Sequence, residues 1–352
     1  MRVSPFDAWI AKAIGQDGDT PDPARLAGWQ LVALRRALDH ARKAPFYRDR
    51  LAQLPPGFPD SFEAFATLAT TTPADLAASF PLFLAVPQEE VARMVTVATS
   101  GTTGAPKRMG LTDADIAETL ECFQVVMAVT LHPGETVLIL FPADKPDSVG
   151  DLIGRGMRRL GALPVFGDPM GNPSRLAEAL AAHRPASLIA APSQLRAALE
   201  DVTAMQAARE TLRSVVYASD YLSPELRERT AARFGCRVLD YYSATEMAYG
   251  GGMECLAGAG YHLREAQLYF EVLDPCSDAP LAAGEVGEVA FTTLTPRGVP
   301  LVRYRTGDAA AMLPGPCPCG SPLRRLGPIL GRIEKTSGGF AVVTPDKGKG
   351  RS

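Results

Sequence analysis

The sequence predicts an α/β protein made mainly of parallel sheets flanked by helices, plus a small β-rich lobe. Two observations lead to this fold class. Between about residues 91 and 260, short β-rich runs alternate with amphipathic stretches, which is typical of a parallel sheet covered by helices on both faces. After about residue 260 the helical signal fades, and strand-like runs are separated by turn residues.

Residues 1–90 predict a helical lead-in. Asp22-Pro23 combines an N-cap residue with a proline at the first helical position. Leu31, Leu34 and Leu38 then recur at steps of three or four residues, which places them on one helix face. We therefore expect a long helix to begin at this point.

Residues 91–260 predict an α/β region. The expected strands are Val95–Ala98, Thr136–Phe141, Leu163–Phe166, Ser187–Ala190, Ser214–Ala218 and Arg237–Tyr241. The expected helices are Val149–Leu160, Ser174–His183, Pro224–Phe234, one that opens at Pro192, and one after Thr112, where Asp115 completes a capping box.

Residues 261–333 predict the β-rich lobe. Leu268–Leu273 and Glu288–Leu294 alternate in polarity like strands, with turn residues between them. The remaining stretch, 334–352, ends in the polar and glycine-rich sequence Asp346–Ser352, for which we expect a disordered tail.

Composition excludes several classes of protein. A hydrophobic content of 46% and a charged content of 21% are ordinary for a soluble globule. A formal net charge of −3 excludes the broad basic surface of a general nucleic-acid binder. No apolar run reaches the ~20 residues that a membrane span needs, and charges at Asp7, Lys12 and Asp17 argue against a secretory signal. Six cysteines in a long chain do not look like a disulfide framework, so the cytoplasm is the expected compartment.

The stretch from Thr99 to Lys107 is rich in hydroxyl groups and glycine. Hydroxyls and bare backbone N–H groups can wrap phosphate oxygens, and Lys107 adds a positive charge. It is not a Walker loop, and a mobile surface loop is the alternative. The phosphate-binding candidates are Thr99, Ser100, Gly101, Thr102, Thr103, Gly104 and Lys107.

This stretch resembles the phosphate loop of the adenylate-forming (AMP-binding) enzymes. Within them the chain is most similar to the phenylacetate–CoA ligase family, because Ala44-Pro-Phe-Tyr-Arg48 and Pro81–Pro87 resemble signatures of that branch. The resemblance covers about residues 29 to 333. It implies that the chain forms the large N-terminal region of the adenylate-forming fold, with residues 91–260 as its α/β nucleotide-binding region.

Residues 241–246, Tyr-Tyr-Ser-Ala-Thr-Glu, resemble a second motif of the family. The resemblance implies that Tyr241 and Tyr242 supply the aromatic cover of the adenine, that Thr245 contacts the α-phosphate, and that Glu246 helps to hold Mg²⁺. Ser243 departs from the family, which usually has glycine there, and its side chain could shift the loop. A strand end with a solvated glutamate is the alternative.

Three further elements resemble nucleotide contacts of the family. Asp308, in a sequence similar to the family's "YRTGD" element, is expected to accept from both ribose hydroxyls; the alternative is a turn aspartate. Ser219 and Asp220 lie where the family places a loop that contacts adenine. Arg332 follows Gly331 in a pair similar to the one that precedes the family hinge, and the arginine is expected to reach the nucleotide.

Cys255, His262, Cys317 and Cys319 form a candidate zinc site. Thiolate and imidazole are ligands that tetrahedral Zn²⁺ accepts, and four protein ligands would make the site structural. From spacing alone, three unrelated thiols and an imidazole remain an equal alternative. The resemblance favours zinc, because several members of the branch carry a similar pattern.

The resemblance implies ATP-dependent adenylation of a carboxylic acid, followed by transfer of the acyl group to a thiol such as CoA. Lys107, Thr245 and Glu246 are the expected catalytic residues; ATP, Mg²⁺, CoA and structural zinc are the expected cofactors. The acid, with an aromatic acid as one option, should lie near Phe141–Gly150 and Tyr242–Gly252. No nucleic-acid or membrane partner is expected, and the family's frequent dimers leave a homodimer open.

Residues 334–352 resemble only a remnant of the family hinge. The family's C-terminal lobe, which carries a catalytic lysine, is expected to be missing; Lys335 lies at the hinge and is not a good substitute. Adenylation is therefore expected to be weakened. The alternatives are a non-catalytic or partner-dependent module that holds ATP or an acyl-adenylate, and a metal-stabilised scaffold with a vestigial pocket.

Overall fold

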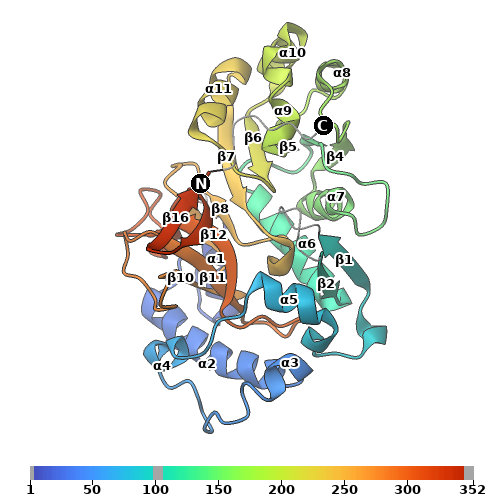
Figure 1. Cartoon of the computed structure of the whole chain (residues 1–352). Helices are drawn as coiled ribbons and strands as arrows, with labels where there is room; N and C mark the ends of the chain where they lie inside the picture. Colours follow the sequence, from blue (N-terminus) through green and yellow to red (C-terminus); the bar gives the residue numbers. More distant parts are fainter. Residues whose placement is uncertain (1–3, 98–105, 345–352) are drawn as a thin grey trace.

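The computed structural model describes residues 4–97 and 106–344 (Figure 1). Within these residues the strands form a nine-stranded, a five-stranded and a two-stranded sheet. Helices from the middle of the sequence lie around the larger sheet, and the N-terminal helices lie at the opposite end of the molecule. No helix in the described ranges is both long and apolar enough to cross a membrane.

The nine-stranded sheet confirms the predicted parallel architecture and extends it. Its order is β13-β14-β9-β8-β7-β6-β5-β3-β4, and the five strands from β7 to β4 are parallel. They are β3 (Thr136–Ile139), β4 (Leu163–Phe166), β5 (Ser187–Ala190), β6 (Ser214–Ala218) and β7 (Arg237–Tyr242). The antiparallel strands are β8 (Gly252–Glu254), β9 (Tyr261–Leu263), β13 (Met312–Leu313) and β14 (Arg325–Leu326). Three of these four come from residues 261–333, so the larger sheet is not confined to residues 91–260.

Helices cover both faces of the parallel strands, as predicted. Ile189 and Val216 belong to one core cluster with residues of α6 and α7, whereas Leu188 and Val215 belong to another with residues of α8 and α11. Successive strand residues therefore face opposite layers. The helices are α6 (Asp113–Met127), α7 (Val149–Leu160), α8 (Pro173–His183), α9 (Pro192–Leu195), η3 (Ala198–Glu200), α10 (Val202–Thr211) and α11 (Pro224–Phe234).

The five-stranded sheet is the predicted β-rich lobe. It is antiparallel, in the order β10-β11-β12-β15-β16. Its strands are β10 (Leu268–Leu273), β11 (Gly287–Thr293), β12 (Tyr304–Ala310), β15 (Gly331–Thr336) and β16 (Gly339–Val343). Residues 334–343, expected in the hinge remnant and tail, thus complete a hairpin of this sheet.

The N-terminal residues form the expected helical lead-in. Asp22 caps the long helix by accepting from the backbone N–H of Arg25, and Leu34 and Leu38 are buried in a cluster with the β-rich lobe. The short helices α1, α3 and α4 within this lead-in were not predicted individually. The elements are α1 (Asp7–Ala13), α2 (Pro23–Ala41), α3 (Pro45–Arg48), α4 (Phe62–Ala66), α5 (Pro73–Ser79), η1 (Phe80–Phe83) and η2 (Gln88–Glu90).

The phosphate-loop candidate connects the two strands of a hairpin. β1 (Arg93–Val97) pairs with β2 (Lys107–Leu111) in antiparallel register, with Val97 opposite Lys107. The strand β2, which lies between the loop and α6, was not predicted. The predicted capping box of α6 is confirmed at Thr112 and Asp115.

Candidate active site

A cavity of about 890 Å³ lies at the carboxyl ends of β5, β6 and β7, between the two larger sheets. Clefts at this edge of a parallel sheet are common ligand sites. Every described residue predicted to bind the nucleotide lines this cavity: Lys107, Ser219, Asp220, Tyr241, Tyr242, Thr245, Glu246, Asp308 and Arg332. The remaining candidates, Thr99 to Gly104, lie outside the described residues.

Glu246 is held by two groups at one of its carboxylate oxygens. It lies in the short helix η4 (Thr245–Met247), and its side chain is 6% exposed. Lys107, at the start of β2, forms an ion pair with Oε1, and the hydroxyl of Tyr304 donates to the same oxygen at 2.9 Å. Within the described part of the chain, no hydrogen bond is found at Oε2. This oxygen is the kind of ligand that Mg²⁺ takes, so Glu246 fits the role expected of it.

Tyr242 and Asp308 join two motifs that lie far apart in the sequence. The tyrosine hydroxyl donates to Oδ2 of Asp308 at 2.9 Å, and Arg332 forms an ion pair with Oδ1. Burial, followed by the Asp308 charge, raises the pKa of Tyr242 well above its usual value, so the phenol stays protonated. Gly307 has a φ of 81°, and a Cβ there would collide with the guanidinium of Arg332. The turn before Asp308 therefore requires glycine.

Several residues that line the cavity were given no role in the sequence analysis, among them Tyr304 and Asp240. Tyr304 lies within the motif that ends at Asp308, but its hydroxyl was given no role. Asp240 directly precedes the aromatic pair; it accepts from Tyr261 Oη at 2.6 Å and also lines the cavity. Burial raises the pKa of Asp240 to about 7. The sequence signal was a single acidic residue at the end of an apolar strand.

Around the aromatic motif, the backbone angle φ is ordinary at Ser243 and unusual at three other residues. Ser243 is not among the residues with positive φ, so its side chain imposes no backbone strain. Ser219 has a φ of 80°, and Ala248 and Tyr249 have values of 49° and 59°. Such conformations are uncommon for residues other than glycine and concentrate at functional sites. Ser219 and Tyr249 both line the cavity.

Part of the cavity wall, which we call the apolar end, consists mainly of apolar side chains. Phe141, Pro142, Ser148 and Val149 line it, which places part of the predicted 141–150 segment there. The polar residues between Pro142 and Ser148 do not line the cavity. The other apolar walls come from α6, α7 and the parallel strands: Phe123, Val126, Met127, Ile153, Ile189, Val216 and Ala218.

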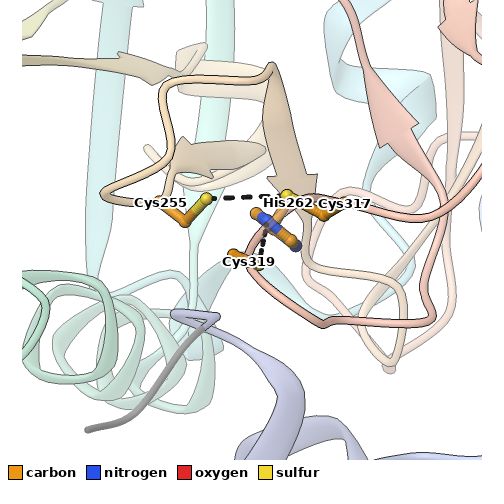
Figure 2. Close-up of side chains that lie close together, drawn as sticks. All are labelled: Cys255, His262, Cys317 and Cys319. Carbon is orange, nitrogen blue, oxygen red and sulfur yellow. Dashed lines mark hydrogen bonds between the residues drawn. The ribbon is translucent and has the colours of Figure 1, made fainter.

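The four predicted metal ligands converge on one point (Figure 2). Their ligand atoms all lie within 4.8 Å of one another, with 3.7 Å between Sγ of Cys255 and Cys317, and 3.5 Å between Sγ of Cys319 and Nε2 of His262. Tetrahedral zinc, with usual bond lengths, places two sulfurs roughly 3.8 Å apart and sulfur and nitrogen roughly 3.6 Å apart. Burial lowers the pKa of His262 to about 4, which favours the neutral, metal-binding imidazole. The donor set and spacing fit zinc.

Comparison with known proteins places the chain in a family. The model of the AMP-binding enzyme family matches residues 73–294, which include β1, η4 and the cavity residues between them. The chain belongs to this family.

Its relatives include phenylacetate-coenzyme A ligases. The enzyme of Pseudomonas putida is 32% identical over 318 residues, covering 87% of this chain and 70% of the relative. The enzyme of Escherichia coli (strain K12) is 31% identical over 330 residues, covering 90% and 73%.

Solved structures share the fold. An open conformation of 2-hydroxyisobutyryl-CoA ligase, in complex with 2-HIB-AMP and CoA, aligns with a TM-score of 0.78 and 24% identity over 92% of this chain and 79% of that one. An anthranilate CoA ligase in complex with anthranoyl-AMP aligns over 70% of this chain with a TM-score of 0.51 and 19% identity. These likenesses establish the adenylate-forming fold.

Proposed function

We propose that the protein is an acid–thiol ligase that uses ATP to adenylate a small carboxylic acid and then forms its CoA thioester. The observation that carries the proposal is the convergence of Lys107, Tyr242, Glu246 and Asp308 on one cavity. Its relatives are named phenylacetate-coenzyme A ligases, which disfavours the alternative of a non-catalytic ATP or acyl-adenylate module.

The nucleotide would be bound along one wall of the cavity. Tyr242 offers an aromatic face to the adenine, and the Asp308 carboxylate accepts from the ribose hydroxyls. The ion pair between Arg332 and Asp308 and the hydrogen bond from Tyr242 hold that carboxylate in place before the nucleotide arrives. Ser219 and Asp220 would border the base.

The phosphates would lie near Lys107, Thr245 and Glu246. When bound, Mg²⁺ neutralises charge on the phosphate oxygens, and Glu246 Oε2 is the oxygen available to hold it. An oxygen of the acid attacks the α-phosphorus in line, the bond to the bridging oxygen breaks, and pyrophosphate leaves. Thr245 donates to the α-phosphate, and Lys107 supplies positive charge. Positioning and charge stabilisation supply the catalysis.

The acyl group would occupy the apolar end of the cavity. In the second reaction the sulfur of CoA attacks the carbonyl carbon of the acyl-adenylate, and AMP leaves. The walls offered by Phe123, Phe141 and Ile153 favour an acid with an aromatic or compact branched body over a charged one.

Zinc would be held by Cys255, His262, Cys317 and Cys319 as a structural ion. All four ligands come from the protein, so no position is left for substrate. The ion would join the β8–β9 connection to the 317–320 turn. All six cysteines are free, which supports a reducing compartment such as the cytoplasm; a homodimer remains an expectation that a measurement of mass in solution would test.

Acid-dependent exchange between labelled pyrophosphate and ATP tests the proposal, using a panel of aryl, branched and linear acids. We expect exchange with at least one aryl or branched acid, and CoA thioester formation with the same acid. ATP binding detected by calorimetry without exchange for any acid would instead support the binding-module alternative. Absence of both ATP binding and exchange would support the remaining alternative, a metal-stabilised scaffold with a vestigial pocket.

A further inference from the structure

We infer that the N-terminal segment, residues 4–13, is part of the metal centre, so that metal binding and docking of this segment stabilise each other. The inference rests on the metal site proposed above and does not depend on catalytic activity. The segment lies more than 240 residues from His262 in the sequence, and its contacts with the centre come from Ser4 and Asp7.

Ser4 holds the ring of the only histidine in the cluster. Its Oγ lies 3.2 Å from Nδ1 of His262, while Nε2 faces Cys319. Ser4 is 7% exposed and His262 is 1% exposed, so water does not compete for this contact. An imidazole that gives Nε2 to a metal carries its proton on Nδ1, which then donates to the serine. Ser4 therefore selects the tautomer and ring orientation that present Nε2 to the ion.

Asp7 holds the turn that carries two of the cysteines. The hydroxyl of Ser321 donates to Oδ1 of Asp7 at 2.8 Å, and both residues are buried. Ser321 closes the turn because its carbonyl accepts from the backbone N–H of Cys317 at 3.3 Å. The N-terminal segment thus contacts the centre on both sides: the histidine strand through Ser4 and the cysteine turn through Asp7.

The other side of the segment is fixed to the main core. Phe6 and Ile10 are fully buried in the cluster that contains residues of α6, and Trp9 Nε1 donates to Glu121 Oε1 on that helix at 2.9 Å. Phe123, which also belongs to α6, lines the cavity. The segment is therefore a packed bridge between the metal centre and α6.

Coupling of this kind is reciprocal. A metal that fixes His262 and the 317–320 turn strengthens the binding surface for residues 4–13, and the docked segment strengthens metal binding by the same factor. Loss of a hydrogen-bond partner of a metal-binding histidine commonly lowers metal affinity by about 10- to 100-fold.

The first experiment measures zinc affinity of the full-length protein by competition with a chromophoric chelator. We expect Ser4→Ala to bind zinc about tenfold more weakly or worse, Ser321→Ala to be weakened as well, and Ser4→Thr, which keeps the hydroxyl, to be close to the wild type. Ser61→Ala is the matched control, because Ser61 caps the distant helix α4. Equal affinity in Ser4→Ala and the wild type would overturn the inference.

The second experiment follows the segment itself by limited trypsin digestion. Lys12 is exposed on α1, and cleavage after it requires the helix to undock. We expect metal-loaded protein to resist this cut, and chelated protein or Ser4→Ala to be cut early. Early cleavage after Arg324 or Arg325 in chelated protein, with Lys12 still resistant, would contradict the coupling. Failure of the wild type to bind zinc at all would contradict the metal site itself. None of these zinc-binding or digestion results bears on the proposed ligase activity, which pyrophosphate exchange tests separately.

Discussion

The hydroxyl of Tyr304 donates to Oε1 of Glu246 at 2.9 Å, on the same oxygen that Lys107 pairs with. Tyr304 lies in β12 of the five-stranded sheet, whereas Glu246 lies in η4, which follows β7 of the nine-stranded sheet. With Oε1 engaged by both groups, Oε2 has no hydrogen-bond partner among the described residues and is the oxygen available to Mg²⁺.

Tyr304→Phe should weaken the response to Mg²⁺. A hydrogen bond to a charged group contributes about 1.5–3 kcal/mol, so we expect roughly a 10- to 100-fold loss in kcat/KM for MgATP. The measurement is pyrophosphate exchange as a function of Mg²⁺ concentration. Tyr47→Phe is the matched control, because the buried hydroxyl of Tyr47 bonds Thr71 outside the cavity. An equal loss in both variants would indicate a stability effect only.

Asp308→Asn should raise KM for ATP and leave KM for the acid nearly unchanged. The amide keeps the shape but cannot accept two ribose hydroxyls and pair with Arg332 at the same time. We expect a rise of about tenfold or more, since hydrogen bonds to a charged acceptor are lost. Steady-state kinetics with each substrate varied in turn gives both constants. A rise confined to the acid would contradict the assignment of Asp308 to the ribose.

Ile153→Trp should block the apolar end of the cavity. The larger side chain, on α7, would occupy space assigned to the acyl group. We expect the loss of kcat/KM for bulky acids to be at least tenfold greater than the loss for acetate-sized acids. Displacing even one methylene group from an apolar pocket changes kcat/KM by about 10-fold or more. ATP affinity, measured by calorimetry, should not change. Uniform loss for all acids would mean that the acid binds elsewhere.

Metal removal should lower thermal stability. A structural zinc that binds only the folded state adds its binding free energy to stability, so chelation or Cys317→Ser should lower Tm. Cys276→Ser is the matched control, because Cys276 is exposed and lies outside the cluster. Calorimetric melting with and without chelator is the measurement. A wild-type Tm that chelation leaves unchanged would argue against a structural ion.

Asp240 should make stability depend on pH. Burial raises its pKa from 3.8 to about 7, so the folded state keeps a proton that the unfolded state releases. The stabilising contribution is complete below pH 3.8 and is lost as the pH rises to about 7. Asp240→Asn, which stays neutral, should reduce this loss between pH 5 and 7.5. Urea denaturation at several pH values would measure the free energy of unfolding of the wild type and of Asp240→Asn. The same pH dependence in both proteins would contradict the prediction.

Local sequence signals located most of the elements. The N-cap at Asp22 and the capping box at Thr112 and Asp115 mark helix starts, and short apolar runs mark the parallel strands; these signals act within a few residues and need no tertiary context. The hairpin strand β2 was missed, because Lys107–Leu111 contains charged residues and glycine and gains its strand partners only from β1.

The sequence by itself determined the family, the order of most elements and most residues of the candidate site, because each motif is short and continuous. Only the tertiary structure decided that Tyr304 and Lys107 contact one oxygen of Glu246, that Asp240 faces the cavity, and that Ser4 reaches His262. Such contacts join residues from distant parts of the chain. They depend on strand order and on the packing of separate sheets and helices, which periodicity within a single segment does not encode.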